Sequence, residues 1–349
     1  MNVSLFLRGW LLCAAVLAAA ALGAAPLGAQ TLINGAGATF PAPLYTKWFS
    51  DYRSVDPSVQ INYQAIGSGG GIQQITEGTV DFGASDGPMT DEQLKNFHAK
   101  QGSDVLHFPT VLGAAVPTYN VPGVTEALAF TPQALADIFL GKIKKWNDPA
   151  IQNANPKVKL PNEDIVVAHR SDGSGTTYCW TDFLSKVSAE WQKRVGKNTS
   201  VKWPVGLGGK GNEGVTGLVK QTPGSIGYVE LIYAVKNKLP YGSVKNQAGA
   251  FVRADLKSVV AAAASVAQTM PADFRVSITN APGKEAYPIS TFTWLLIPSH
   301  ISDAGKREAI KKLLKWVLTS GQSSAASLEY AELPKAVQAR ELAAIAKIK

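Results

Sequence analysis

The chain has 349 residues, of which 46% are hydrophobic and 17% are charged. This length exceeds one ordinary core and fits two domains, and the composition excludes wholesale disorder. Lys and Arg number 34 against 26 Asp and Glu, a net charge of +8 that helps to attract anions, but no stretch is dominated by basic residues, so nucleic-acid binding is not indicated.

The N-terminus has the pattern of an export signal. Arg8 precedes an apolar run that ends near Leu22, and small residues then lead to Ala29, where cleavage is expected. We therefore predict a signal peptide over residues 1–29, a segment too short and too rich in alanine for a membrane anchor. Its removal leaves Cys179 as the single cysteine, without a partner for an internal disulfide. The predicted compartment is outside the cytoplasm, most simply a bacterial periplasm.

The rest of the chain alternates strand-like and helix-like segments, which is the pattern of an α/β protein. Residues 59–66 alternate apolar and polar side chains up to Gly67 and predict a strand. Thr90 and Gln93 have the spacing of a capping box and predict a helix to about Lys100.

Two further helices are predicted downstream. Thr131 is a candidate N-cap with Pro132 in the first helical position, and Gly141 closes this helix. Residues 310–318 repeat apolar side chains at helical spacing, so this helix is expected to pack on a domain.

Two strand-like stretches, residues 108–112 and 287–297, are candidate connections between two lobes. They place one lobe at residues 30–110 plus 290–349 and the other at residues 111–289.

Four short loops hold the candidate binding residues. In the first, residues 35–43, glycines let the backbone approach a ligand, Thr39 adds a hydroxyl, and prolines can begin a helix with free N–H groups. In the second, residues 67–71, Ser68 is the predicted N-cap of a helix, where free N–H groups and the helix dipole attract anions. Taken alone, either loop is also explained by an ordinary turn, and the second lacks the Gly-Lys-Ser/Thr ending of a Walker loop.

The third loop, residues 81–88, is interpreted as a tight turn. It contains Asp81 and Asp86, and aspartates in such turns usually form a helix cap or an Asx-turn.

The fourth loop, residues 170–177, is the strongest single motif. Arg170 supplies a planar fork that matches phosphate or carboxylate oxygens, and Asp172 is placed to hold it still. Hydroxyls and backbone N–H groups where a helix begins are offered by Ser174, Gly175 and Thr176. A capped helix with a surface salt bridge is the alternative interpretation.

Catalytic interpretations of these loops lack essential parts. Ser174 lies in Gly-Ser-Gly-Thr and not in the Gly-x-Ser-x-Gly elbow of hydrolases. The four histidines have no metal-ligand spacing. Cys179 lies between two aromatic residues in a segment predicted to be helical, and it is predicted to be buried and inert. We therefore predict neither an enzyme nor a metal or other cofactor.

Taken together and in order, these segments resemble the periplasmic phosphate-binding proteins of the phosphate-specific ABC transporter (PstS-like proteins). The segments that carry the resemblance are residues 35–43, 67–71, 80–86, 139–146, 170–176, 203–212 and 224–230. The resemblance covers essentially the whole mature chain. It implies an α/β, two-lobed type II periplasmic binding protein fold, in which each lobe is a mixed sheet flanked by helices and phosphate lies in the interlobe cleft.

The resemblance also implies site residues by position. Those that would contact the anion are Thr39, Phe40, Ser68, Asp86, Arg170, Ser174, Gly175 and Thr176. Phe40 and Gly175 can do so only through backbone N–H groups, and Asp172 would brace Arg170. Gly69 and Gly87 stand where a serine and an alanine are common in the family.

An acidic residue in an anion site suggests how the anion is selected. Bound phosphate carries at least one proton at neutral pH, whereas sulfate carries none. The carboxylate of Asp86 can only accept hydrogen bonds, so phosphate can donate to it while sulfate would face it with like charge. Such a mismatch in a dry site costs several kcal/mol, on the order of a thousandfold in affinity.

We therefore expect a protein that closes two lobes around inorganic phosphate and delivers it, as a monomer, to the membrane permease of an ABC transporter. Two alternatives stay open. A secreted phosphatase would need a nucleophile with a base, or metals. A binding protein for another oxyanion could take sulfate, molybdate, arsenate or a phosphonate, although Asp86 argues against fully deprotonated anions.

Overall fold

The computed structural model describes residues 30–349, so the predicted signal peptide, residues 1–29, lies outside the described residues. Eight strands form one continuous sheet in the order β2-β1-β3-β11-β4-β8-β6-β7. Their bounds are β1 Thr31–Gly37, β2 Val59–Ala65, β3 Phe82–Ser85, β4 Val105–Asn120, β6 Val166–Arg170, β7 Leu207–Gly209, β8 Ser225–Glu230 and β11 Ser290–Pro298.

The sheet has two parts, and the 16-residue strand β4 contributes to both of them. Its first part pairs antiparallel with β11, from Val105 opposite Pro298 to Ala114 opposite Ser290. Its second part pairs antiparallel with β8, from Ala115 opposite Glu230 onward. We call the part built on β2, β1, β3, β11 and the start of β4 the first lobe, and the part built on the end of β4, β8, β6 and β7 the second lobe.

Both lobes contain parallel and antiparallel pairs. In the first lobe β1 pairs parallel with β2 and β3, while β11 pairs antiparallel with β3 and β4. In the second lobe β6 pairs parallel with β7 and β8, while β8 pairs antiparallel with β4. The predicted fold class, two lobes that each hold a mixed sheet, is confirmed. The strands predicted at 108–112 and 292–297 are present and pair with each other, but residues 287–289 precede β11 and are not strand. The exact lobe limits stay a prediction.

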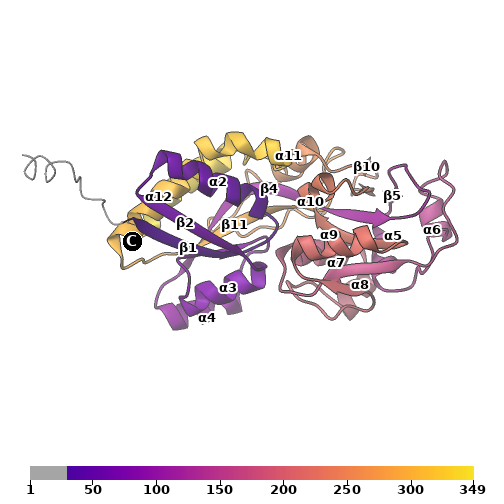
Figure 1. Cartoon of the computed structure of the whole chain (residues 1–349), viewed down its shortest axis with the longest axis horizontal. Coiled ribbons are helices and arrows are strands. Elements are labelled where there is room, and N and C mark those ends of the chain that lie inside the picture. The colour runs from indigo at the N-terminus through magenta and orange to yellow at the C-terminus, as the bar shows by residue number, and fades with distance from the viewer. Residues whose placement is uncertain (1–29) are drawn as a thin grey trace, which may run out of the picture.

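Helices flank the sheet in both lobes (Figure 1). In the first lobe α2 (Ala42–Val55) and α12 (Ala304–Val317) lie on one face, and α3 (Ser68–Glu77) and α4 (Asp91–Gln101) lie on the other. The second lobe holds a small sheet of β5 (Ala129–Phe130), β9 (Ser243–Lys245) and β10 (Phe251–Val252), with helices α5 Pro132–Phe139, α6 Pro149–Gln152, α7 Gly175–Val187, α8 Ala189–Arg194, α9 Gly211–Gln221, α10 Leu231–Lys236 and α11 Leu256–Ala264.

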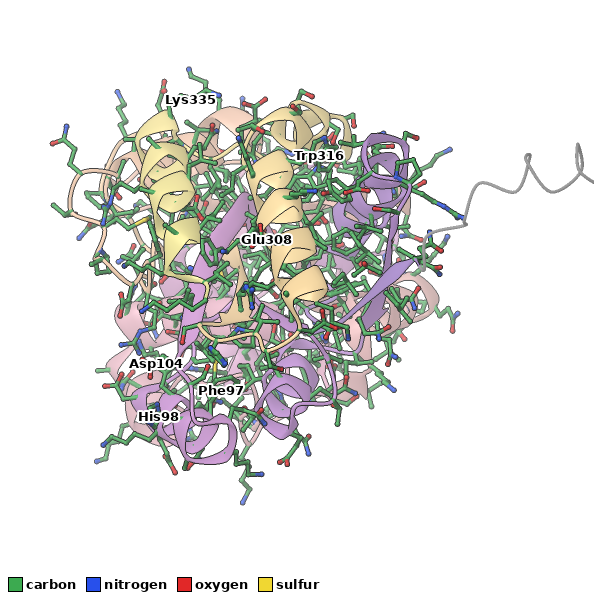
Figure 2. The ribbon with its side chains drawn as sticks, turned by 90° about the vertical axis from the view of Figure 1, so that its left-hand side faces the viewer. Phe97, His98, Asp104, Glu308, Trp316 and Lys335 are labelled. Carbon is green, nitrogen blue, oxygen red and sulfur yellow. The ribbon has the colours of Figure 1, made fainter. Side chains whose placement is uncertain are left out.

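The chain ends on the first lobe. Two 3-10 helices (Ser320–Leu328 and Ile345–Lys347) flank α13 (Lys335–Ala344). Figure 2 shows α12, with Glu308 and Trp316, and α13, which begins at Lys335, at the opposite end of this lobe from Phe97 and His98 of α4.

Local signals in the sequence fix several helix ends as predicted. Thr90 Oγ1 accepts a hydrogen bond from the Gln93 N–H (3.2 Å), and Gln93 Oε1 accepts one from the Thr90 N–H (2.9 Å), which completes the capping box. Thr131 caps α5. The apolar face of α12 is buried, as predicted.

The prediction of a tight turn over residues 81–88 is wrong for residues 82–85, which form β3. This short strand lies between β1 and β11 and is buried throughout, so its side chains show no polar alternation that would reveal a strand. Asp86 follows directly at its carboxyl end.

A segment without regular secondary structure, residues 270–279, contacts both lobes. Toward the first lobe, the Arg275 guanidinium donates to Asp91 Oδ1 at 2.7 Å. Toward the second lobe, the Ser277 and Thr279 hydroxyls both donate to Asp182 Oδ2 in α7, each at 2.5 Å. This segment therefore links the lobes in addition to β4 and β11.

Candidate functional site

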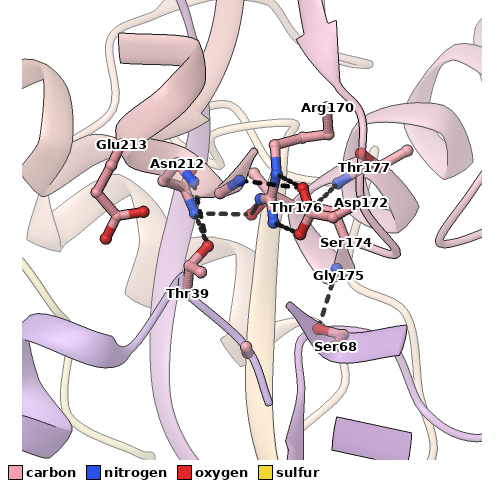
Figure 3. A network of polar contacts seen from close by, with 12 residues as sticks. Thr39, Ser68, Arg170, Asp172, Ser174, Gly175, Thr176, Thr177, Asn212 and Glu213 are labelled. Carbon is pink, nitrogen blue, oxygen red and sulfur yellow. Dashed lines mark hydrogen bonds and ion pairs between the residues drawn. The ribbon is translucent and has the colours of Figure 1, made fainter. Parts of the chain in front are cut away.

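The residues predicted to bind the anion come together where the two lobes meet. Four helices begin beside them: α2 at Ala42, α3 at Ser68, α7 at Gly175 and α9 at Gly211. Figure 3 shows Thr39 and Ser68 from the first lobe facing Arg170, Gly175 and Thr176 from the second. Each helix start directs free backbone N–H groups and the positive end of its dipole outward. The arrangement therefore favours a small anion.

Several backbone donors at this point have no protein partner. Within residues 30–349, we find no acceptor for the N–H groups of Phe40, Ser68 or Thr176, although all three residues are fully buried. Buried backbone donors in folded proteins nearly always have a partner. These three donors are therefore suited to an anion that accepts several hydrogen bonds at once.

Arg170 is held in one orientation by Asp172. Its Nε donates to Asp172 Oδ1 at 2.8 Å and its Nη2 donates to Asp172 Oδ2 at 2.5 Å, which is a two-point pair. The Gly211 N–H also donates to Asp172 Oδ1, at 3.0 Å. Burial alone would raise the pKa of Asp172, but the hydrogen bonds and charge of Arg170 bring this pKa below its usual value. Arg170 Nη1 also donates to Thr176 Oγ1 at 3.4 Å, and the two guanidinium hydrogens that are left can donate to an anion.

Ser68 lies one position further into helix α3 than the N-cap position predicted for it. Gly67 is the N-cap of α3, and Ser68 is its first helical residue. Gly67 takes this place because its φ of 90° disfavours other residues and because a Cβ here would lie 2.3 Å from Asp172 Oδ2. Ser68 Oγ accepts hydrogen bonds from the Gly175 N–H at 3.0 Å and from the Asp86 N–H at 3.3 Å.

Asp86 is the acidic group of the site and is 1% exposed. Its Oδ1 accepts a hydrogen bond from the Thr293 hydroxyl at 2.8 Å. Desolvation raises the pKa of Asp86 from its ordinary value of 3.8 to about 7, against the opposing effects of the Thr293 hydrogen bond, the charge of Arg170 and the Ser68 hydrogen bond. In this closed arrangement Asp86 can therefore accept or hold a proton near neutral pH.

Ser174 occupies the N-cap of α7. Its Oγ accepts a hydrogen bond from the Thr177 N–H at 3.0 Å, so the hydroxyl both fixes the helix start and keeps its hydrogen for another partner. The helix start predicted for the fourth loop is confirmed.

Sequence reasoning missed several residues that contact the predicted site. Asn212, in α9, donates through Nδ2 to Thr39 Oγ1 at 2.8 Å and to Thr176 Oγ1 at 3.2 Å. The sequence contains a pattern that could have indicated Asn212, because the glycine-rich residues 206–211 precede a helix just as the second loop does. Tyr233 and Tyr330 donate to the carbonyl oxygens of Thr39 and Phe40, and no local pattern marks them.

Glycines allow the lobes to touch beside the site. The Gly69 N–H donates to the Gly173 carbonyl oxygen at 2.8 Å, and a Cβ on Gly69 would lie 2.9 Å from Gly173 Cα. A Cβ on Gly87 would lie 2.7 Å from the Tyr178 ring. At the two positions where this chain has glycine and the resemblance suggests larger residues, the lobes thus approach each other closely.

Among residues 30–349, no group of three or more His, Cys, Asp or Glu side chains could hold a metal ion. Cys179 is buried, as predicted, and burial raises the pKa of its thiol well above the usual value. In the described part of the chain, no helix combines the length and apolar character that crossing a membrane requires.

Comparisons with known proteins agree with this geometry. The sequence model of the PBP superfamily domain matches residues 24–320. The chain is 47% identical over 303 residues to the phosphate-binding protein PstS of Xylella fastidiosa, covering 86% of this chain and 81% of the relative. It is 46% identical over 306 residues to PstS of Pasteurella multocida, covering 87% of each. A solved phosphate-binding protein from Stenotrophomonas maltophilia has the same fold, with a TM-score of 0.68 at 19% identity over 90% of this chain and 94% of the other.

Proposed function

The chain belongs to the PstS family of phosphate-binding proteins within the PBP superfamily, and we propose that it captures inorganic phosphate between its lobes and delivers it to the permease of an ABC transporter. The anion would be held by Thr39, Phe40, Ser68, Asp86, Arg170, Ser174, Gly175 and Thr176, with Asp172 bracing Arg170. The Gly175 N–H, which donates to Ser68 Oγ in this structure, would turn to the anion when it binds. The chain would act as a binding protein without catalysis and without a cofactor.

The observation that supports this function best is the presence of a fixed guanidinium and a buried carboxyl group in one site. The braced fork of Arg170 supplies positive charge and directed donors for tetrahedral oxygens. Asp86, with a pKa near 7, accepts the proton that phosphate carries and sulfate lacks. In a site that recognised its ligand by negative charge alone, a buried carboxyl group would serve no purpose.

Closure follows from the placement of these groups. Thr39, Phe40, Ser68 and Asp86 belong to the first lobe, and the other four belong to the second, so only the closed form lets one anion contact all of them. An anion that contacts both lobes stabilises the closed form by the contacts it makes there alone. We propose residues 30–110 plus 290–349 and residues 111–289 as the two lobes, with β4 and β11 as crossings.

From the export signal predicted over residues 1–29 we infer that the mature chain acts in the periplasm, as a monomer that docks on the permease. These parts of the proposal rest on the sequence pattern and on the family.

Calorimetric titration of the phosphate-stripped mature protein tests the proposal. We expect one phosphate per chain with a dissociation constant of about 1 μM or tighter, which corresponds to about −8 kcal/mol. Arsenate and a phosphonate are titrated in parallel, and p-nitrophenyl phosphate is supplied as a phosphatase substrate. Absence of phosphate binding, tighter binding of another oxyanion, or turnover of the ester would overturn the proposed function.

A further inference from the structure

We propose that Asn212 is a positioning residue of the phosphate site, which turns the hydroxyl hydrogens of Thr39 and Thr176 toward the bound anion. This inference rests on the proposed function, because it concerns how the same site binds its ligand. Asn212 ends one of the segments that carry the resemblance, residues 203–212, but it is not among the site residues that the resemblance implies.

The first step concerns Thr39. A hydroxyl group has one hydrogen to donate and two lone pairs that accept. Thr39 Oγ1 accepts from the Asn212 N–H at 3.2 Å and from Asn212 Nδ2 at 2.8 Å, so both lone pairs are used. Its hydrogen must therefore point elsewhere, and Thr39 is only 3% exposed.

The second step concerns Thr176, which is fully buried. Thr176 Oγ1 accepts from Asn212 Nδ2 at 3.2 Å and from Arg170 Nη1 at 3.4 Å. Again both lone pairs are used and the hydrogen is left over. Within residues 30–349, we find no acceptor for either hydroxyl hydrogen, which leaves an anion between the lobes as the natural acceptor.

The third step is that the Asn212 amide has only one possible orientation. Its Oδ1 accepts a hydrogen bond from the Glu230 N–H at 2.9 Å. A flipped amide would place an NH2 group against that N–H and lose the bond. Both hydrogens of Nδ2 are consequently directed at the two threonines (Figure 3), and the buried side chain makes three hydrogen bonds, two through Nδ2 and one through Oδ1.

Asn212 therefore acts on phosphate without touching it. The two threonines lie on different lobes, so one amide group coordinates donors on both sides of the anion. Because Thr176 shares the second lobe with Asn212, its hydroxyl is fixed before binding and loses less conformational freedom when the anion arrives, whereas the Thr39 hydroxyl is oriented when the lobes close. Without the amide, each hydroxyl could turn a lone pair toward the anion and repel it.

A double-mutant cycle between Asn212 and Thr176 tests this role, because both residues lie on the second lobe and their coupling does not report lobe closure. Phosphate affinity is measured by calorimetry for the wild type, Asn212→Ala, Thr176→Val and the double variant. We expect Asn212→Ala to weaken binding about tenfold or more in the wild type, and clearly less in the Thr176→Val background. Asn120→Ala, which removes a side chain bonded to the Lys220 carbonyl oxygen, serves as the control and should bind like the wild type.

A second variant covers the case in which Asn212→Ala does not fold. Asn212→Asp keeps the size but replaces the two donors with an acceptor, so both hydroxyls would donate to it and face phosphate with lone pairs. We expect this variant to bind phosphate about a hundredfold more weakly than the wild type. Equal losses from Asn212→Ala in both backgrounds, or affinities of both Asn212 variants equal to the wild type, would overturn the inference. Failure of the wild type to bind phosphate would instead overturn the proposed function.

Discussion

The Gly175 N–H, at the first position of α7 in the second lobe, donates a 3.0 Å hydrogen bond to the Ser68 hydroxyl oxygen, at the first position of α3 in the first lobe. The starts of two helices from opposite lobes therefore touch directly. Because both helix starts carry partial positive charge, their close approach is unfavourable by itself and is favoured by an anion between them. At this contact the lobes are so close that one added side-chain atom would interfere with their closure.

Gly175→Ala should hinder closure. A Cβ at this position would lie 2.5 Å from both Asp86 Oδ2 and Ser68 Oγ, within fully buried surroundings. Overpacking of this kind typically costs about 1–3 kcal/mol, which corresponds to a loss of about fivefold to 150-fold in phosphate affinity. Calorimetry measures the loss, and Gly217→Ala in α9, where a Cβ would meet nothing within 4 Å, is the matched control. An alanine at 175 that binds phosphate like the wild type would show that the lobes need not approach this closely.

Sulfate binding should depend on pH through Asp86. In an open cleft, where water reaches the carboxyl group, we expect its ordinary pKa of 3.8, whereas closure raises the pKa to about 7. Closing over sulfate at neutral pH therefore requires a proton from solvent, and the protonated fraction falls tenfold for each pH unit above the ordinary pKa. Sulfate affinity should rise about tenfold per unit as pH falls from 7 to about 4 and then level off. Titrations at pH 5, 6 and 7 measure this slope. A sulfate affinity that does not change with pH would contradict the requirement for a proton.

Asp182→Ala should destabilise the fold. This buried carboxylate accepts hydrogen bonds from Lys197, Ser277 and Thr279 and pairs with Lys186, so it anchors residues 270–279 to α7. Although burial alone would raise the pKa of Asp182, these partners lower it to about 2. The depressed pKa contributes about 2 kcal/mol to stability above pH 4, a contribution that is lost as pH falls from about 4 to 2.

Removal of a buried, paired charge typically costs about 3–5 kcal/mol, since its partners are left behind. Urea unfolding at pH 7 measures this loss for Asp182→Ala, with Asp164→Ala, at a mostly exposed side chain, as the control. Equal stability of the two variants would contradict the anchoring role of Asp182.

The parts of the fold and site that could be predicted from the sequence are those encoded locally. Thr90 with Gln93 and Thr131 with Pro132 mark helix starts within a few residues, and glycine-rich stretches before helices mark the loops that carry Ser68 and Ser174. The buried strand β3 has no polar alternation, so it was indistinguishable from a turn. Thr293 reaches Asp86 from 207 residues away, and only the pairing of β11 with β3 brings them together. Asn212 shares the local signal of the other loops, but its role depends on contacts with two other segments.

The central claim is that Asp86 selects phosphate by accepting its proton, and the most direct test compares Asp86→Asn with the wild type at pH 7. Asparagine keeps the size of the side chain but can donate a hydrogen bond to sulfate. Calorimetry should show a phosphate preference on the order of a thousandfold for the wild type and below about tenfold for the variant. A variant that retains the wild-type preference would contradict the claim and assign selection to other groups.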